Sequence, residues 1–116
     1  MLTISKMTGN DQPQQIRYKI KLGLRQYTVA FDIQELEEGG ESKLQWSEAT
    51  FDLGKPTYSQ LVAAIVQSRY PNDDMQAIIN NHLLEDGDAE HEAEWDAMQA
   101  WRVEAKAKAK EILEEL

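Results

Sequence analysis

Apolar and polar residues alternate strictly in two neighbouring stretches of the chain, a pattern typical of half-buried β-strands. The first stretch is Ile16–Leu22 and the second is Tyr27–Ile33. A two-residue turn at Gly23–Leu24 would pair Tyr18 with Val29, and the other apolar residues would meet in the same way. The sequence therefore predicts an antiparallel hairpin whose apolar residues share one core-facing side.

A third strand is predicted after a second turn at Gly39–Gly40, where two glycines can adopt positive φ. Its apolar residues occupy one phase up to Trp46 and the other phase from Ala49 to Leu53. A β-bulge near Ser47–Glu48 would turn both sets toward one core. We therefore expect a bulge in this strand.

The second half of the chain changes to helical spacing. Thr57 is a good N-cap and Gln60, three residues later, completes a capping box, while Pro71 disfavours helical geometry before it. Between them, one helix face collects Tyr58, Leu61, Val62, Ile65, Val66 and Arg69. This helix is expected to pack on the sheet.

Two further helices are predicted. Asn72 is expected to cap the second helix, which stops before Gly87, and Asp88 is expected to cap a long third helix. The end of the third helix is rich in alanine and lysine, and its alanines bury little surface. We therefore expect this end to project from the body or to pack on another copy.

Together these elements predict an α+β domain. An N-terminal antiparallel meander of three strands, or four, is followed by three helices packed on one face or end of the sheet. The 116 residues suit one domain, with residues 14–54 in the meander and 57–116 in the three-helix segment. Residues 1–13 fit either an extra strand or a disordered segment.

The net charge of −9 is unevenly distributed. Residues 1–34 hold five basic and two acidic residues, a net charge of +3, so the remainder carries −12. An acidic protein is a poor ligand for nucleic acid. No apolar stretch approaches the roughly 20 residues needed to cross a bilayer, and the first residues lack the basic and apolar regions of a secretion signal, so we expect none. We expect a cytoplasmic location, with virion association as an alternative, and neither nucleic-acid nor membrane partners.

The residues offer little catalytic or metal chemistry. His82 and His91 flank an acidic turn that contains Glu85, Asp86 and Asp88, but no zinc or calcium spacing is present. A solvated turn between two helices explains the same residues. Cysteine is absent, and neither a nucleophile motif nor a glycine-rich phosphate loop occurs. We therefore expect no metal, no cofactor and no enzymatic activity.

The third helix offers the best candidate for a partner surface. Its residues Trp95 and Trp101 border one apolar stripe, where tryptophan either packs in a core or marks an interface. The candidate partner surface comprises Trp95, Trp101, Arg102, Glu90 and Glu94.

A spaced pattern in the second half of the chain comprises Tyr58, Leu61, Val62, Ala64, Ile65, Arg69, Tyr70, Asp74, Ile78, Trp95, Gln99, Trp101, Arg102, Ala105 and Lys106. This pattern covers about half of the chain and resembles uncharacterised small proteins encoded in phages and prophages of gut Bacteroidetes. The resemblance implies a structural, assembly or accessory protein that acts through contacts with other proteins of phage or host, and with itself as a further option. It implies no catalytic site.

The sequence leaves two alternative functions open. The −12 charge of residues 35–116 suits an acidic decoy or inhibitor that binds a basic host surface. A small hydrolase is the third option, and it would require carboxylates or histidines that converge in a cleft.

Overall fold

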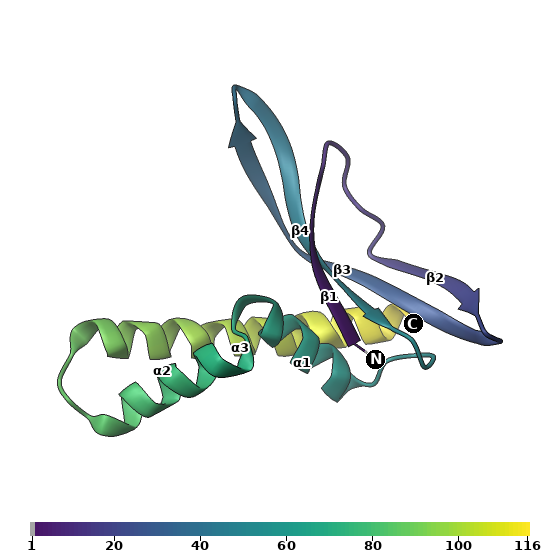
Figure 1. Ribbon diagram of the computed structural model, residues 1–116. Helices are drawn as coiled ribbons and strands as arrows, with labels where there is room; N and C mark the ends of the chain where they lie inside the picture. The colour runs from purple at the N-terminus through teal and green to yellow at the C-terminus, as the bar shows by residue number, and fades with distance from the viewer. Residues whose placement is uncertain (1) are drawn as a thin grey trace.

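Four antiparallel strands form one sheet in the order β1-β4-β3-β2 in the computed structural model, which describes residues 2–116 (Figure 1). The strands are β1 (Leu2–Gly9), β2 (Ile16–Lys21), β3 (Leu24–Glu38) and β4 (Glu41–Phe51). Three helices follow, so the predicted α+β class is confirmed, with the sheet in its four-stranded form. Within the N-terminal segment, β1 is the extra strand and pairs with β4. Met1 lies outside the described residues.

The hairpin of β2 and β3 forms with a different register from the predicted one. Tyr18 lies opposite Tyr27, and the two turn residues are Leu22 and Gly23, with φ of 53° and 79°. The predicted turn at Gly23–Leu24 is therefore wrong by one residue, and each predicted pair is wrong by two. Positive φ at both turn positions gives the twist that suits tightly connected strands. A two-residue shift keeps every side chain on its face, so the apolar pattern cannot distinguish the two registers.

The predicted β-bulge near Ser47–Glu48 is also wrong, because β4 pairs with β1 without a break. The irregularity lies in the neighbouring strand β3, between Phe31 and Gln34, where two residues face Trp46 of β4. Asp32 adopts a φ of 58° at this bulge. Asp tolerates this left-handed conformation better than most residues, which explains how β3 bends here.

Without a bulge, the apolar residues of β4 divide between the two faces of the sheet. Ala49 and Phe51 face the helices, whereas Trp46 lies on the opposite face, where its Nε1 donates to Glu48 at 3.1 Å. Leu53 follows β4 and is 80% exposed. The predicted single core for these residues is therefore incorrect.

The helices are α1 (Tyr58–Arg69), α2 (Asn72–Leu84) and α3 (Ala89–Glu115). The capping box of α1 is confirmed: Thr57 Oγ1 accepts from the Gln60 N–H, and Gln60 Oε1 accepts from the Thr57 N–H. Asp88 caps α3 as predicted. Asn72 does not cap α2, because only two residues separate α1 from α2 and Asn72 is already helical, which leaves Pro71 at the N-cap position.

The core lies between one face of the sheet and a layer made by α1 and the C-terminal half of α3. Ala105, Ala109 and Ile112 of α3 are fully buried there, so the predicted projection of this helix end is wrong. Small side chains bury little area themselves, but they let α3 approach its neighbours closely. The core cluster comprises Val29, Phe31, Ala49, Phe51, Leu61, Ala64, Ile65, Val66, Trp101, Ala105, Ala109 and Ile112.

The other end of the helical layer projects instead. In Figure 1, α2 and the N-terminal half of α3 extend away from the sheet as an antiparallel pair. No residue of α2 is fully buried. The radius of gyration is 16.4 Å, compared with about 13 Å for a compact domain of this length. The molecule is therefore open, with a helical projection and a sheet that diverge from a shared core.

Candidate functional site

The projecting helices concentrate the acidity of the protein. Residues 72–96, which we call the acidic arm, contain nine acidic residues and no lysine or arginine. All nine carboxylate side chains belong to exposed residues: Asp73, Asp74, Glu85, Asp86, Asp88, Glu90, Glu92, Glu94 and Asp96. The arm thus carries a net charge of −9, equal to the charge of the whole chain.

A stacked pair of rings holds the two helices of the acidic arm together. The His82 ring of α2 lies parallel to the Trp95 ring of α3, with centroids 3.9 Å apart. His82 Nδ1 also lies 3.2 Å from both carboxylate oxygens of Glu92. Trp95 is half-buried in this contact, so it serves the packing of the arm and keeps part of its ring accessible.

Hydrogen bonds order the turn at the tip of the arm. Asp86 accepts from the Asp88 N–H at 3.0 Å and lies 3.0 Å from His91 Nδ1. Partial desolvation lowers the pKa of His91, but the contact with Asp86 and the nearby carboxylates outweigh it and raise the pKa above its ordinary value. Within residues 2–116, no three histidine or carboxylate side chains are grouped to hold a metal ion. The acidic turn is thus a structured, anionic tip.

The structure separates the five residues of the candidate partner surface. Trp101 is only 7% exposed, and its Nε1 donates to the carbonyl oxygen of Ile65 at 3.0 Å. It therefore packs in the core and offers little area to a partner. The other four divide between the arm, with Trp95 half-buried and Glu90 and Glu94 exposed, and the exposed Arg102 beyond it.

Arg69 joins α1 to the bulge in β3. Its Nε and Nη2 donate to the two carboxylate oxygens of Asp32 at 2.9 and 2.6 Å, and its guanidinium lies 3.7 Å from the centre of the Trp101 ring. Burial raises the pKa of Asp32, but the hydrogen bonds from Arg69 and Gln34 outweigh it and hold the pKa below its ordinary value. Because its donors already engage Asp32, we assign Arg69 a structural role.

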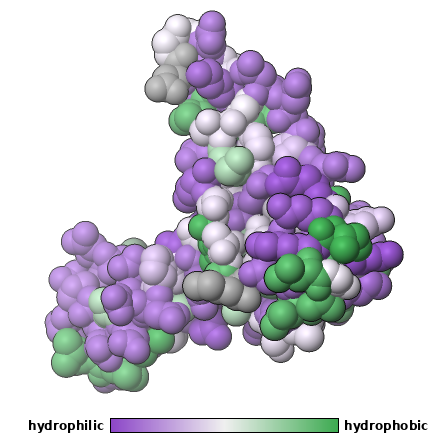
Figure 2. All heavy atoms as spheres, turned by 45° about the vertical axis from the view of Figure 1, so that its right-hand side comes forward, coloured by the Kyte–Doolittle hydropathy of each residue, from purple (hydrophilic) through white to green (hydrophobic). Residues whose placement is uncertain are grey.

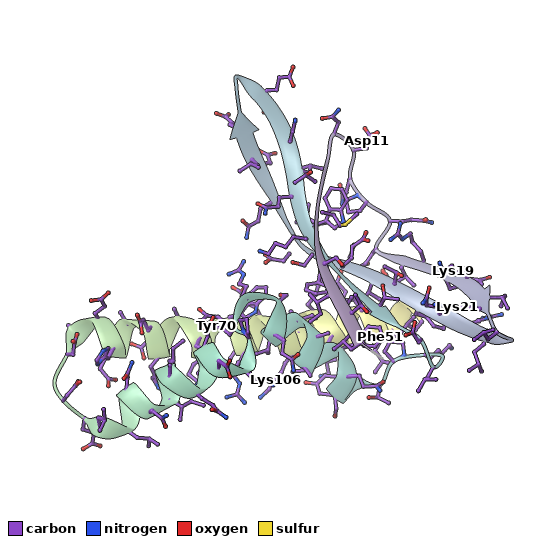
Figure 3. The ribbon with its side chains drawn as sticks, in the orientation of Figure 1. Asp11, Lys19, Lys21, Phe51, Tyr70 and Lys106 are labelled. Carbon is purple, nitrogen blue, oxygen red and sulfur yellow. The ribbon has the colours of Figure 1, made fainter. Side chains whose placement is uncertain are left out.

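A second charged surface lies at the far end of the sheet. Residues 16–25, which we call the basic hairpin, contain Arg17, Lys19, Lys21 and Arg25 and no acidic residue. Figure 3 shows Lys19 and Lys21 on β2, at the end of the molecule opposite the arm. The longest dimension of the molecule is 52 Å, so opposite charges are well separated.

The basic hairpin also exposes apolar side chains that the alternating pattern predicts to face the core. Tyr18 and Ile20 are 59% and 65% exposed, because the helices do not cover this end of the sheet. Figure 2 shows hydrophobic residues gathered on the right-hand lobe and at the lower edge of the left-hand lobe. The sequence did not show that this edge strand is left uncovered, because apolar and polar residues alternate in the same way in a covered and an uncovered strand.

Comparisons with models of protein families, with curated proteins and with solved structures find no match. Among the described residues, no helix is long and apolar enough to cross a membrane.

Proposed function

We propose that the protein acts by binding other proteins, without catalysis, as a structural, assembly or accessory component of a phage or prophage. The observation that carries the proposal is the acidic arm, which projects from the core, has no fully buried residue in α2, and yet is ordered by specific contacts. A projection of this kind adds little to a core, whereas it presents a shaped surface to a partner.

The extent of the surface supports the same proposal. The accessible surface is 7773 Å², and a compact monomer of 13.3 kDa has roughly 6,500 Å². Leu83 and Leu84 at the end of α2 are 70% and 69% exposed, beside the acidic tip. A partner with a basic surface and an apolar centre would match this combination. The resemblance to phage and prophage proteins supports an action in the host cytoplasm or in the virion.

The experiment is a capture assay with the products of neighbouring genes, using the whole chain as bait. The arm variant replaces four exposed carboxylates by their amides, at Glu85, Glu90, Glu94 and Asp96. The matched control replaces four exposed carboxylates outside the arm, at Glu35, Glu37, Glu41 and Glu114. Both variants lose the same charge, so we expect only the arm variant to lose its partner. Capture of nothing by the unmodified chain, or equal loss by both variants, would contradict the proposal.

A second candidate function is that of an acidic decoy, which would occupy a basic surface of a host protein. The observation in its favour is the density of charge: nine carboxylates without one lysine or arginine over residues 72–96. Such a decoy would compete with nucleic acid for its target. Binding that is unaffected by salt, or that leaves nucleic acid bound, would argue against this function.

A further inference from the structure

An apolar face of the basic hairpin is only partly covered within the molecule, by the Arg25 guanidinium, which lies 4.7 Å from the centre of the Tyr18 ring. Tyr18 and Ile20 lie on the same side of the sheet as the core residues Val29 and Phe31, yet they are 59% and 65% exposed. An open groove of about 460 Å³ remains between the hairpin and the end of α3. It is lined by Gln15, Ile16, Tyr18, Arg25, Tyr27, Lys55, Glu115 and Leu116.

The charge of the hairpin limits what can cover this face. Arg25 and Lys55 border the groove, and Arg17, Lys19 and Lys21 lie on the opposite side of the same edge strand. Lysines on an edge strand oppose pairing with an identical edge, because like charges would then face each other. Two copies cannot therefore join favourably through their hairpins.

The acidic arm has the complementary properties. Leu83 and Leu84 provide apolar side chains at its tip, and Glu85, Asp86 and Asp88 follow directly in the chain. No basic residue of the arm opposes contact with Arg25 and Lys55, which line the groove beside Glu115. The arm cannot reach the hairpin of its own molecule, because the two lie at opposite ends of the long axis (Figure 1).

We propose that the tip of the acidic arm of one copy docks on the apolar face of the basic hairpin of a second copy. This inference rests on the proposed function and names a second copy of the chain as the partner. The two surfaces are different and lie at opposite ends, so the contact is head-to-tail. Repetition of such a contact extends a chain of molecules or closes a ring.

The sizes of the two surfaces predict a weak and reversible contact. The six residues of β2 span about 20 Å, and the tip of the arm is two helices wide, which is also about 20 Å. A patch of this length and the width of two helices is small compared with the roughly 800 Å² that each partner buries in a standard interface. Association should therefore depend on protein concentration and weaken as salt screens the charges.

Sedimentation with two blocked variants tests the inference. The first variant, Ile20→Asp, blocks the hairpin, and its carboxylate lies opposite Arg25, so the opposite charges favour the fold. The second variant, Leu83→Ser/Leu84→Ser, blocks the arm. Each blocked variant retains one intact surface. We expect each variant alone to sediment as a 13.3 kDa monomer and an equal mixture to form a heterodimer of twice that mass and nothing larger.

The controls separate folding and surface effects. The mean mass of the unmodified chain should rise with protein concentration at low salt. Val103 is 68% exposed on α3 outside both surfaces, so Val103→Asp should associate like the unmodified chain. Circular dichroism checks that all variants are folded. A monomeric unmodified chain at low salt, or a mixture that stays monomeric, overturns this inference. The proposed function would survive that result if the capture assay still found a partner dependent on the arm.

Discussion

The contact between Asp32 and Arg69 supplies the most informative perturbation of the fold. It joins the bulge of β3 to the last turn of α1, and Asp32 combines an ion pair with a φ of 58°. Asp32→Asn removes the charge but retains a residue that tolerates positive φ. Asp32→Ala removes the hydrogen bonds as well. Alanine, unlike Asp or Asn, has no polar side chain that can form a local hydrogen bond in the left-handed conformation.

The magnitudes follow from the exposure of the two partners. Hydrogen bonds to charged groups contribute about 1.5–3 kcal/mol, and the lower end applies because the Arg69 side chain is 38% exposed. We expect Asp32→Asn to lower the free energy of unfolding by about 1 kcal/mol, since one neutral hydrogen bond can remain. Asp32→Ala should lower it by about 3 kcal/mol, because a left-handed alanine costs about 1–2 kcal/mol more.

Urea denaturation followed by tryptophan fluorescence measures these differences. A double-mutant cycle with Arg69→Met, which keeps an aliphatic contact on Trp101, should give a coupling energy of about 1 kcal/mol. Because the pKa of Asp32 is lowered in the folded state, the coupling should be complete above the ordinary carboxylate pKa and decrease as pH falls through the folded value. Equal stability of Asp32→Asn, Asp32→Ala and the unmodified chain, or a coupling that does not change at acidic pH, would refute the reasoning.

Three further predictions concern the core, a turn and the acidic tip. Ile65→Asp should unfold the protein, because it buries a charge at a site only 1% exposed, whereas Lys106→Asp on the exposed side of α3 should change the free energy of unfolding by less than about 0.5 kcal/mol. Equal thermal midpoints for the two would contradict the assigned core. Leu22→Asn should raise the free energy of unfolding by about 0.5–1 kcal/mol, since Leu22 is 97% exposed with positive φ, and a lower urea midpoint would contradict this. The pKa of His91, measured by NMR titration, should exceed 6.5 and fall in Asp86→Asn. Since the folded state binds this proton more tightly, the contribution of His91 to stability is present below the unfolded pKa and disappears as pH rises through the folded value. An unchanged titration in Asp86→Asn would count against the contact.

Local signals in the sequence correctly predicted two helix starts and one glycine turn, although Asn72 does not cap α2. Thr57 with Gln60, and Asp88, mark helix starts that the structure has in the predicted places. The glycines of the turn between β3 and β4 likewise have positive φ as predicted. These features depend on neighbours within a few residues, which a sequence displays directly.

Features that depend on other segments were not recoverable. The register of β2 on β3 differs from the prediction by two residues, which leaves the apolar pattern unchanged. The bend of the sheet is in β3 at Asp32, whereas the change of apolar phase in β4 pointed to the wrong strand. The burial of Ala105 and Ala109 depends on how closely α3 approaches α1, which composition does not reveal.

The properties of the acidic arm and of the basic hairpin were likewise only partly predictable from the sequence. The charge of the acidic arm can be counted in the sequence, but its projection from the body depends on which half of α3 meets the sheet. The exposure of Tyr18 and Ile20 depends on where the helical layer ends, and no local pattern encodes that limit.

The lack of a fully buried residue in α2 has a consequence for native-state motion. Met75 of this helix packs against the main core but is only partly buried, so α2 should behave as a unit of low local stability. Its amide protons should exchange with deuterium far sooner than those of α1, whose Leu61 and Ile65 are sealed in the core. A bound partner that rests on both helices of the arm would slow exchange in α2 selectively, which makes this helix a built-in reporter of occupancy.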